Sequence, residues 1–176
     1  MYINDKDKFI ILDVEGNAAM GISQNRITQF AALSFHNGEI EELNYYNRSV
    51  NYISKYAYKM THISVKKCKR EGLSERHMVK LIYEAIKDCK MIYAYGLHYD
   101  KQIINYLFDK YNMPKINIPW YDIINDVDKY LCPSKQKLSI AANEYGFDST
   151  GFHDALCDCY ATYHLMNVIE SVREDK

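Results

Sequence analysis

The sequence FIILDVEGNA, residues 9–18, changes abruptly from apolar to acidic. Its first four residues form an apolar run typical of a strand buried in a sheet, and we expect a strand over about residues 8–14. Asp13 and Glu15 are separated only by Val14, and residues two apart in a strand point to the same face. Two carboxylates this close repel each other unless something neutralises them. The segment therefore predicts a buried strand that ends in an acidic site.

The bulk composition is that of a globular protein. With 176 residues, 48% hydrophobic and 26% charged, the chain can bury one core, and we predict a single domain over residues 1–176. No apolar stretch approaches the ~18 residues needed to span a bilayer, and the N-terminus lacks a signal-peptide layout. The five cysteines include no C-x-x-C pair, which favours free thiols. We expect a cytoplasmic protein without membrane contact.

The order of the expected elements predicts an α/β fold. Asn37-Gly38 is a turn signal between two strand-like segments. Ser74 and Asp154 are expected N-caps of helices, and Gly146 is an expected helix-ending glycine. The expected strands cover residues 8–14, 26–35, 40–50, 90–96 and 116–123, and the expected helices cover 74–89, 100–113, 137–147 and 154–172. Three strands of a meander followed by alternating strands and helices imply a mixed sheet flanked by helices.

Two further carboxylates are candidates to join the acidic pair. Asp100 follows the fourth expected strand, and Asp158 lies one turn into the last helix. Clusters of carboxylate oxygens suit Mg²⁺ or Mn²⁺. His153 lies five residues before Asp158, where it would reach the site without being a metal ligand. A net charge of −1 offers no basic field for nucleic acid, but bound metal ions would change the local sign.

These residues carry a resemblance to a known family. The set is Asp13, Glu15, Asp100, His153 and Asp158. In order and spacing it resembles the DEDDh 3′→5′ exonucleases, the DnaQ-like branch of the ribonuclease H-like superfamily, over nearly the whole chain. The related DEDDy branch has a tyrosine four residues before the last aspartate, where this chain has Asp154. The resemblance implies a ribonuclease H-like mixed five-stranded sheet, with an antiparallel three-strand meander plus parallel strands.

The resemblance also implies roles for the site residues. Two divalent ions about 3.5–4 Å apart can activate a nucleophile and stabilise a leaving oxygen in phosphodiester hydrolysis. Asp13 would bridge two Mg²⁺ or Mn²⁺ ions, Glu15 and Asp158 would hold one of them, and Asp100 would support the other. His153 would be the general base, because an ordinary imidazole pKa of ~6.5 suits proton removal near neutral pH.

The substrate contacts depart from the family pattern. The family usually has Thr after the first Glu, where this chain has Gly16-Asn17, and often His-Asn where this chain has Tyr95-Gly96. The segment THIS, residues 61–64, resembles the family's His-Gly-Ile-Thr but has no Gly after His62. The residues that we expect to contact substrate are Val14, Gly16, Asn17, His62 and Ile63.

The expected activity is metal-dependent 3′→5′ hydrolysis of single-stranded DNA or RNA from a free 3′ end, with release of nucleoside 5′-monophosphates. An alternative is a nucleic-acid-binding or trans-acting proofreading or maturation subunit with weak catalysis. The chain could act as a homodimer or in trans with a larger assembly. Asp122 and Asp154 are expected to be structural, and the spacing of Cys157, Cys159 and His164 fits no standard zinc site.

Overall fold

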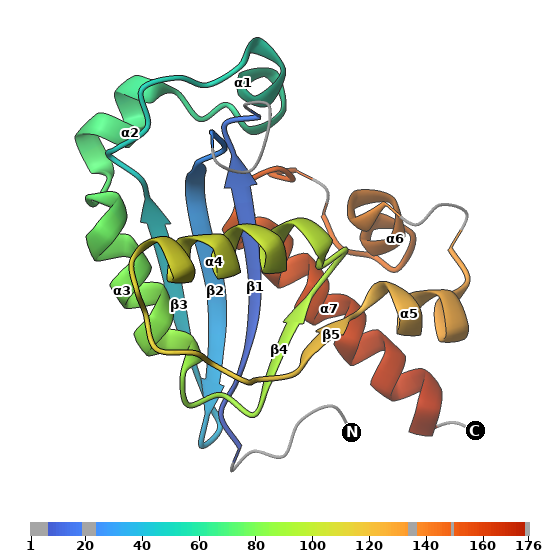
Figure 1. Ribbon diagram of the computed structural model, residues 1–176. Coiled ribbons are helices and arrows are strands. Elements are labelled where there is room, and N and C mark those ends of the chain that lie inside the picture. Colours follow the sequence, from blue (N-terminus) through green and yellow to red (C-terminus); the bar gives the residue numbers. More distant parts are fainter. Residues whose placement is uncertain (1–6, 19–23, 134–136, 149, 175–176) are drawn as a thin grey trace.

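The computed structural model describes residues 7–18, 24–133, 137–148 and 150–174. Its centre is a five-stranded sheet with the order β3-β2-β1-β4-β5 (Figure 1). The strands are β1 Phe9–Gly16, β2 Ile27–His36, β3 Glu39–Tyr46, β4 Met91–Ala94 and β5 Trp120–Asp122. The first three form an antiparallel meander, and β4 and β5 add in parallel to β1. This arrangement confirms the predicted mixed sheet.

Seven α-helices and one π-helical turn are found among the described residues. They are α1 Lys55–Thr61, α2 Val65–Glu71, α3 Glu75–Ile86, α4 His98–Lys110, α5 Ile124–Asp126, η1 Val127–Leu131, α6 Leu138–Glu144 and α7 Ala155–Glu174. Ser54, Ser64 and Ser74 cap α1, α2 and α3, and each hydroxyl accepts a hydrogen bond from the N–H three residues on. None of these helices has both the length and the apolar character to cross a bilayer.

Several boundaries differ from the sequence-based expectation. The first strand continues past the acidic pair to Gly16, and the third ends at Tyr46 rather than residue 50. The last strand is only Trp120–Asp122, after Pro119, whose missing N–H limits strand pairing. Helices α1 and α2 were not predicted. The predicted turn is confirmed, because Asn37 and Gly38 both have positive φ, as a tight hairpin requires.

The sheet separates two apolar cores. On one face, Phe9 and Ile11 of β1 pack in the core cluster that includes Ala155, Leu165 and other residues of α7. On the other face, the alternate β1 residues Ile10 and Leu12 join the cluster formed with α3 and α4. Helices α4 and α7 cross opposite faces of the sheet (Figure 1). The two-residue period of β1 therefore directs the odd-numbered positions, 13 and 15 included, toward the α7 side.

One edge of the sheet gathers the loops that bear the acidic residues. The parallel strands β1, β4 and β5 end there, and α4 begins directly after β4. Asp122 at the end of β5 accepts hydrogen bonds from the backbone N–H groups of Gly96 (2.9 Å) and Leu97 (3.1 Å). Gly96 has φ +76°, a conformation that glycine adopts without strain. Asp122 is thus structural, as predicted, and fixes where α4 starts.

Candidate active site

The structure brings all five predicted catalytic residues to this edge of the sheet. Asp13 and Glu15 come from the end of β1, Asp100 is the third residue of α4, and Asp158 is the fourth residue of α7. His153 lies in the turn just before α7 and is exposed. Three segments far apart in the sequence therefore supply one acidic cluster.

Asp100 is tied directly to β1. Its Oδ1 accepts a hydrogen bond of 3.0 Å from the backbone N–H of Val14, the residue between Asp13 and Glu15. Asp100 is 5% exposed. The predicted contact residue Val14 thus has a clear structural part in the site, because its backbone orients the third carboxylate.

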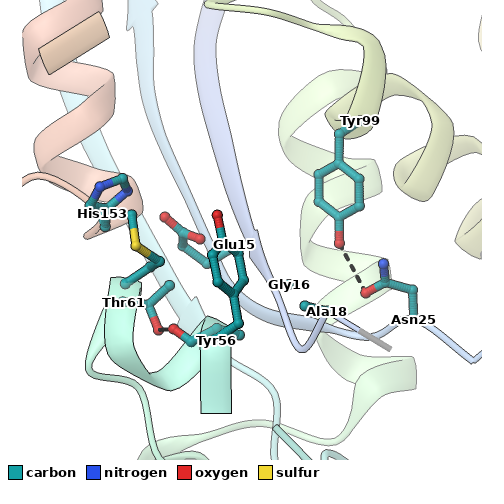
Figure 2. A pocket seen from close by; sticks show the side chains of 10 residues that line it. Glu15, Gly16, Ala18, Asn25, Tyr56, Thr61, Tyr99 and His153 are labelled. Atoms are coloured by element: carbon teal, nitrogen blue, oxygen red, sulfur yellow. Dashed lines mark hydrogen bonds between the residues drawn. The ribbon is translucent and has the colours of Figure 1, made fainter. Parts of the chain in front are cut away.

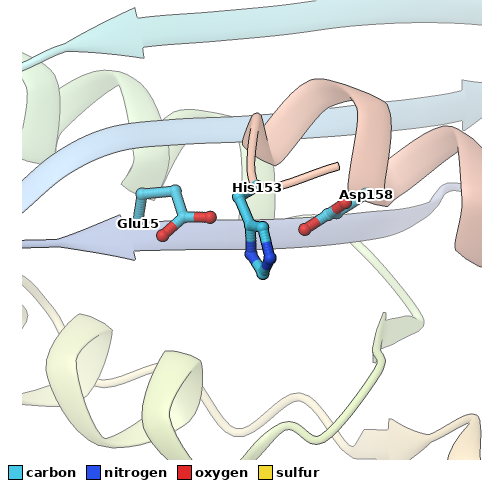
Figure 3. A group of neighbouring side chains, drawn as sticks. All are labelled: Glu15, His153 and Asp158. Carbon is cyan, nitrogen blue, oxygen red and sulfur yellow. The ribbon is translucent and has the colours of Figure 1, made fainter. Parts of the chain in front are cut away.

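Glu15, His153 and Asp158 lie close together. Figure 3 shows the imidazole between the two carboxyl groups. One potential ligand atom from each of these residues lies within 4.8 Å of the other two. This spacing would let His153 act either as a base beside bound ions or as a ligand itself.

Burial and mutual repulsion make the cluster expensive to ionise. Burial, followed by the charges of Asp158 and Asp100, raises the pKa of Glu15 to about 8. Burial raises the pKa of Asp100 to about 7, and that of Asp158 also to about 7. The pKa of Asp13 is raised well above its ordinary value by burial and by Asp100, Asp158 and Glu15. A cation among these groups would favour their ionised forms.

The donor set fits a divalent cation. Of the buried side-chain oxygens and nitrogens in the described part of the chain, Asp158 Oδ1 has no hydrogen-bond partner. A buried carboxylate oxygen normally has a partner, and a metal ion is one explanation for its absence. Carboxylate oxygens are the ligands that hard divalent ions prefer. Asp13, Glu15, Asp100 and Asp158 are therefore suited to hold such ions.

A buried glutamine that the sequence reading missed anchors the start of α7. Gln29 of β2 is 0% exposed. Its Nε2 donates to Asp154 Oδ2 (3.1 Å), and its Oε1 accepts from the backbone N–H of Ala155 (3.3 Å). Asp154 Oδ1 also accepts from the N–H of Leu156 (3.1 Å), which confirms its capping role. The available signal in the sequence was a long polar side chain in the mostly apolar strand β2.

Two hollows flank the cluster. The first, of about 310 Å³, has Glu15, Gly16, Asn25 and Tyr99 in its wall, and we call it the Tyr99 hollow (Figure 2). The second, of about 480 Å³, is the Lys137 hollow and is lined by residues that include Asp13, Tyr95, Lys137, Phe152 and Asp158. Tyr56, Met60 and His153 line both. Helix α1, absent from the sequence-based prediction, thus forms a ridge between the hollows.

Asn17 is a structural clip at the edge of the site. It is 4% exposed. Its Oδ1 accepts from the backbone N–H of Arg26 (2.9 Å), and its Nδ2 donates to the carbonyl oxygen of Tyr52 (3.2 Å). Its carbonyl oxygen also accepts from the N–H of Ser54, the cap of α1. Asn17 therefore holds α1 against the end of β1, and its contact with substrate stays a prediction.

The three other residues predicted to contact substrate, Gly16, His62 and Ile63, differ in their exposure and surroundings. Gly16 lines the Tyr99 hollow. His62 is exposed and is the C-terminal cap of α1. Its φ of +55° is the left-handed conformation that glycine commonly adopts at the end of a helix. Ile63 is 2% exposed and packs with Val50 and Cys68 in a small core cluster. Ile63 therefore serves packing, and a substrate contact of its side chain has no support in this arrangement.

The cysteines and His164 form no zinc site in the described residues. The His164 ring nitrogen lies 2.8 Å from the carbonyl oxygen of Tyr145. Cys159 is buried, with its Sγ 3.5 Å from the carbonyl oxygen of Ala31. All five cysteines are free thiols, as predicted.

The fold is that of exonucleases in the ribonuclease H-like superfamily. A family model for the RNase T group, described as "Exonuclease", matches residues 10–166. The chain belongs to this exonuclease family, in its DEDDh, DnaQ-like branch, which confirms the resemblance seen in the sequence. Membership of this family makes nuclease activity the leading hypothesis for the chain.

Solved structures with the same fold are distant in sequence. E. coli exonuclease I in complex with a dA16 oligonucleotide has a TM-score of 0.84 and 17% identity, covering 97% of this chain and 42% of that chain. The zinc-bound form of the E. coli exonuclease I–single-stranded DNA complex has a TM-score of 0.83 and 18% identity, covering 94% of this chain and 41% of that one. This chain therefore spans about two fifths of the length of those exonucleases. A search of the curated proteins finds no match.

Proposed function

We propose that this protein is a 3′→5′ exonuclease that removes nucleoside 5′-monophosphates from the free 3′ end of single-stranded DNA or RNA. The observation that carries the proposal is the convergence of four carboxylates and His153, from three distant segments, between two hollows. The proposal also draws on the likeness to E. coli exonuclease I, which has been solved with bound oligonucleotides.

Asp13, Glu15, Asp100 and Asp158 would hold two Mg²⁺ or Mn²⁺ ions. When bound, such ions supply activation of the attacking water and charge stabilisation of the leaving oxygen. The chain's own part is to hold the carboxylates at fixed positions through β1, α4 and α7. The unpartnered Asp158 Oδ1 and the raised pKa values of the cluster support this assignment.

His153 would act as the general base. It is exposed beside Glu15 and Asp158, so its imidazole can take a proton from a water molecule at the phosphodiester and pass it to solvent. Asp154 and Gln29 hold the start of α7 and thereby fix the turn that presents His153. The two hollows on either side of His153 offer places for the nucleotides that flank the bond to be cut.

The decisive experiment compares four labelled substrates in Mg²⁺ or Mn²⁺: 5′-labelled linear single-stranded DNA, 5′-labelled linear RNA, a 5′-labelled strand with a 3′-phosphate, and an internally labelled circular single strand. We expect stepwise shortening of a linear strand and release of nucleoside 5′-monophosphates, with resistance of the blocked and circular strands. Excess EDTA should stop the reaction. Efficient cutting of the circle would instead indicate an endonuclease, and activity in EDTA would contradict the metal assignment.

We further propose that residues 1–176 act as one exonuclease domain in the cytoplasm. Size-exclusion chromatography with light scattering would separate a monomer from a homodimer. Activity of the purified chain alone would distinguish a self-sufficient enzyme from a subunit that works in trans. A chain that binds oligonucleotides but cleaves none of them with any divalent ion would support the binding-module alternative.

A further inference from the structure

The hydroxyl of Tyr99 fills the space that a side chain at position 16 would need. A Cβ built on Gly16 would lie 2.1 Å from Tyr99 Oη and 3.0 Å from Tyr99 Cζ. Real Cβ atoms do not come this close to another heavy atom. Gly16 and Tyr99 are therefore sterically complementary. The absence of a side chain at Gly16, which follows Glu15, leaves room for the hydroxyl of Tyr99, which precedes Asp100.

A hydrogen bond to Asn25 directs that hydroxyl. Tyr99 Oη donates to Asn25 Oδ1 at 3.1 Å, and Figure 2 shows both groups beside Gly16 at the wall of the Tyr99 hollow. With its proton directed to Asn25, the phenol oxygen keeps its lone pairs as acceptors. Tyr99 is half-buried: it packs against the core cluster formed with α3 and α4, and it also lines the Tyr99 hollow.

The Tyr99 hollow adjoins the acidic cluster. Glu15 and His153 line it together with Tyr99 and Asn25. In the proposed reaction the phosphate to be cut lies at the carboxylates, so the sugar of a terminal nucleotide in this hollow lies beside the residue that follows Glu15. A sugar hydroxyl there needs an acceptor, because an O–H taken out of water without a hydrogen-bond partner is destabilised.

We propose that Tyr99 reads the end of the strand: its phenol oxygen accepts a hydrogen bond from the 3′-hydroxyl of the terminal nucleotide, and Asn25 is the positioning residue that aims it. This inference rests on the proposed function and deepens it by naming the group that recognises the chain end. It makes Tyr99 a specificity-determining residue for a free 3′-hydroxyl.

The test combines a protein change with a substrate change. Tyr99→Phe removes only the hydroxyl, and a 3′-deoxy terminal nucleotide removes only its proposed partner. We expect the wild-type enzyme to prefer the 3′-hydroxyl strand over the 3′-deoxy strand by about 3- to 10-fold in kcat/KM, mainly through KM. Tyr99→Phe should lose that preference. Tyr106→Phe, two turns along α4, should keep it. Asn25→Ala should weaken it in part.

A binding measurement removes the dependence on turnover. Calorimetry with a nucleoside 5′-monophosphate and its 3′-deoxy counterpart, each in Mn²⁺, should show the same preference in the wild type and its loss in Tyr99→Phe. A Tyr99→Phe protein that folds and retains the wild-type preference would overturn the inference and leave the exonuclease proposal intact. A wild type that cleaves nothing would overturn the exonuclease proposal, and the monophosphate comparison would still decide on Tyr99. Failure to bind either monophosphate would overturn the inference on Tyr99, whereas cleavage of the linear strands decides separately on the exonuclease proposal.

Discussion

The backbone N–H of Val14 donates a 3.0 Å hydrogen bond to Asp100 Oδ1, across 86 positions of sequence. Because Val14 lies between Asp13 and Glu15, this bond sets the third carboxylate of the cluster against the first two. One oxygen of Asp100 is thus used to tie α4 to β1. The same contact holds the first turn of α4 against the end of β1.

Replacement of Asp100 can separate this structural role from its proposed role in metal binding. Asp100→Asn keeps an oxygen that accepts from Val14, so the fold should be as stable as the wild type in EDTA, or more stable, because one repelling charge is gone. Asp100→Ala leaves the buried N–H without a partner and should be about 1–3 kcal/mol less stable than Asp100→Asn. Both should lose metal affinity and nearly all activity. Urea unfolding in EDTA and metal titration calorimetry measure the two effects. Equal stabilities for the two variants would contradict the structural role.

The stability of the metal-free protein should fall as the pH rises. The folded-state pKa is about 8 for Glu15 and about 7 for Asp100 and Asp158, against ~4 in the unfolded chain. The folded state thus binds protons more tightly, so this stabilising contribution is complete below about pH 4 and is lost as the pH rises through 7 to 8. In EDTA we expect the Tm advantage of Asp158→Asn over the wild type to grow by about 4–8 °C between pH 5 and pH 8.

Divalent metal should reverse that loss. At pH 8, Mn²⁺ should raise the Tm of the wild type far more than that of Asp158→Asn, and at pH 5 it should do little because protons compete for the same oxygens. Comparing the two proteins at each pH cancels the titration of groups outside the acidic cluster. A Tm difference that does not change between pH 5 and pH 8 would show that these carboxyl groups do not repel one another as described.

The sequence predicted the strands and long helices where the apolar pattern is continuous. The buried run of β1 and the turn at Asn37-Gly38 are examples. Helices α1 and α2 were not predicted because each is seven residues long and has one buried residue, Ala57 in α1 and Cys68 in α2. Such short helices lack the repeated apolar spacing that identifies a helix, and tertiary contacts hold them in place.

The candidate site was predictable where spacing alone carries the information. Asp13 and Glu15 lie two residues apart on one strand and share a face. Asp100 and Asp158 each lie in the first turn of a helix. The fold therefore brings all four carboxylates together. The surroundings were not predictable, because they depend on contacts between distant segments. Asn17 was predicted to contact substrate, and nothing in the sequence around it indicated that its buried side chain bonds to the backbone of Arg26 and Tyr52. The fit of Tyr99 to Gly16 depends on how α4 meets β1, which no local pattern records.

His153→Ala should lower kcat by about 10²- to 10⁴-fold, the usual contribution of a general base. Metal affinity should change little if the imidazole acts only on water, even though a ring nitrogen lies within 4.8 Å of ligand atoms of Glu15 and Asp158. Single-turnover kinetics and metal titration calorimetry separate the two properties. His36→Ala is the matched control, since His36 is exposed at the opposite end of the sheet. A protein that loses its ions with His153→Ala would make His153 a ligand.

Tyr56→Ala should weaken binding of single-stranded oligonucleotides by roughly 5- to 100-fold, because base stacking on an aromatic ring contributes about 1–3 kcal/mol. Tyr56 is 71% exposed and lines both hollows. Tyr52→Ala is the control, as Tyr52 is 60% exposed and lines neither hollow. Fluorescence anisotropy in Ca²⁺ would give both affinities, and Tm values should stay near the wild type. Equal losses for the two variants would mean that exposed aromatic area, and not the ridge of α1, governs binding.

Gly16→Ala should destabilise the wild-type protein but cost much less in a Tyr99→Phe background. In the wild type the new methyl group would meet Tyr99 Oη at 2.1 Å, and the half-buried ring must shift to admit it, at a cost of about 1–3 kcal/mol. Removal of the hydroxyl leaves Cζ as the nearest ring atom, 3.0 Å away, which a small displacement can relieve. A double-mutant cycle from urea unfolding should therefore give a favourable coupling of about 0.5–2 kcal/mol between the two changes.

Gly38→Ala, at a turn where a Cβ would meet nothing within 4 Å, should show no coupling with Tyr99→Phe. Additive effects of Gly16→Ala and Tyr99→Phe would mean that the hydroxyl does not occupy the space beside Gly16 in solution.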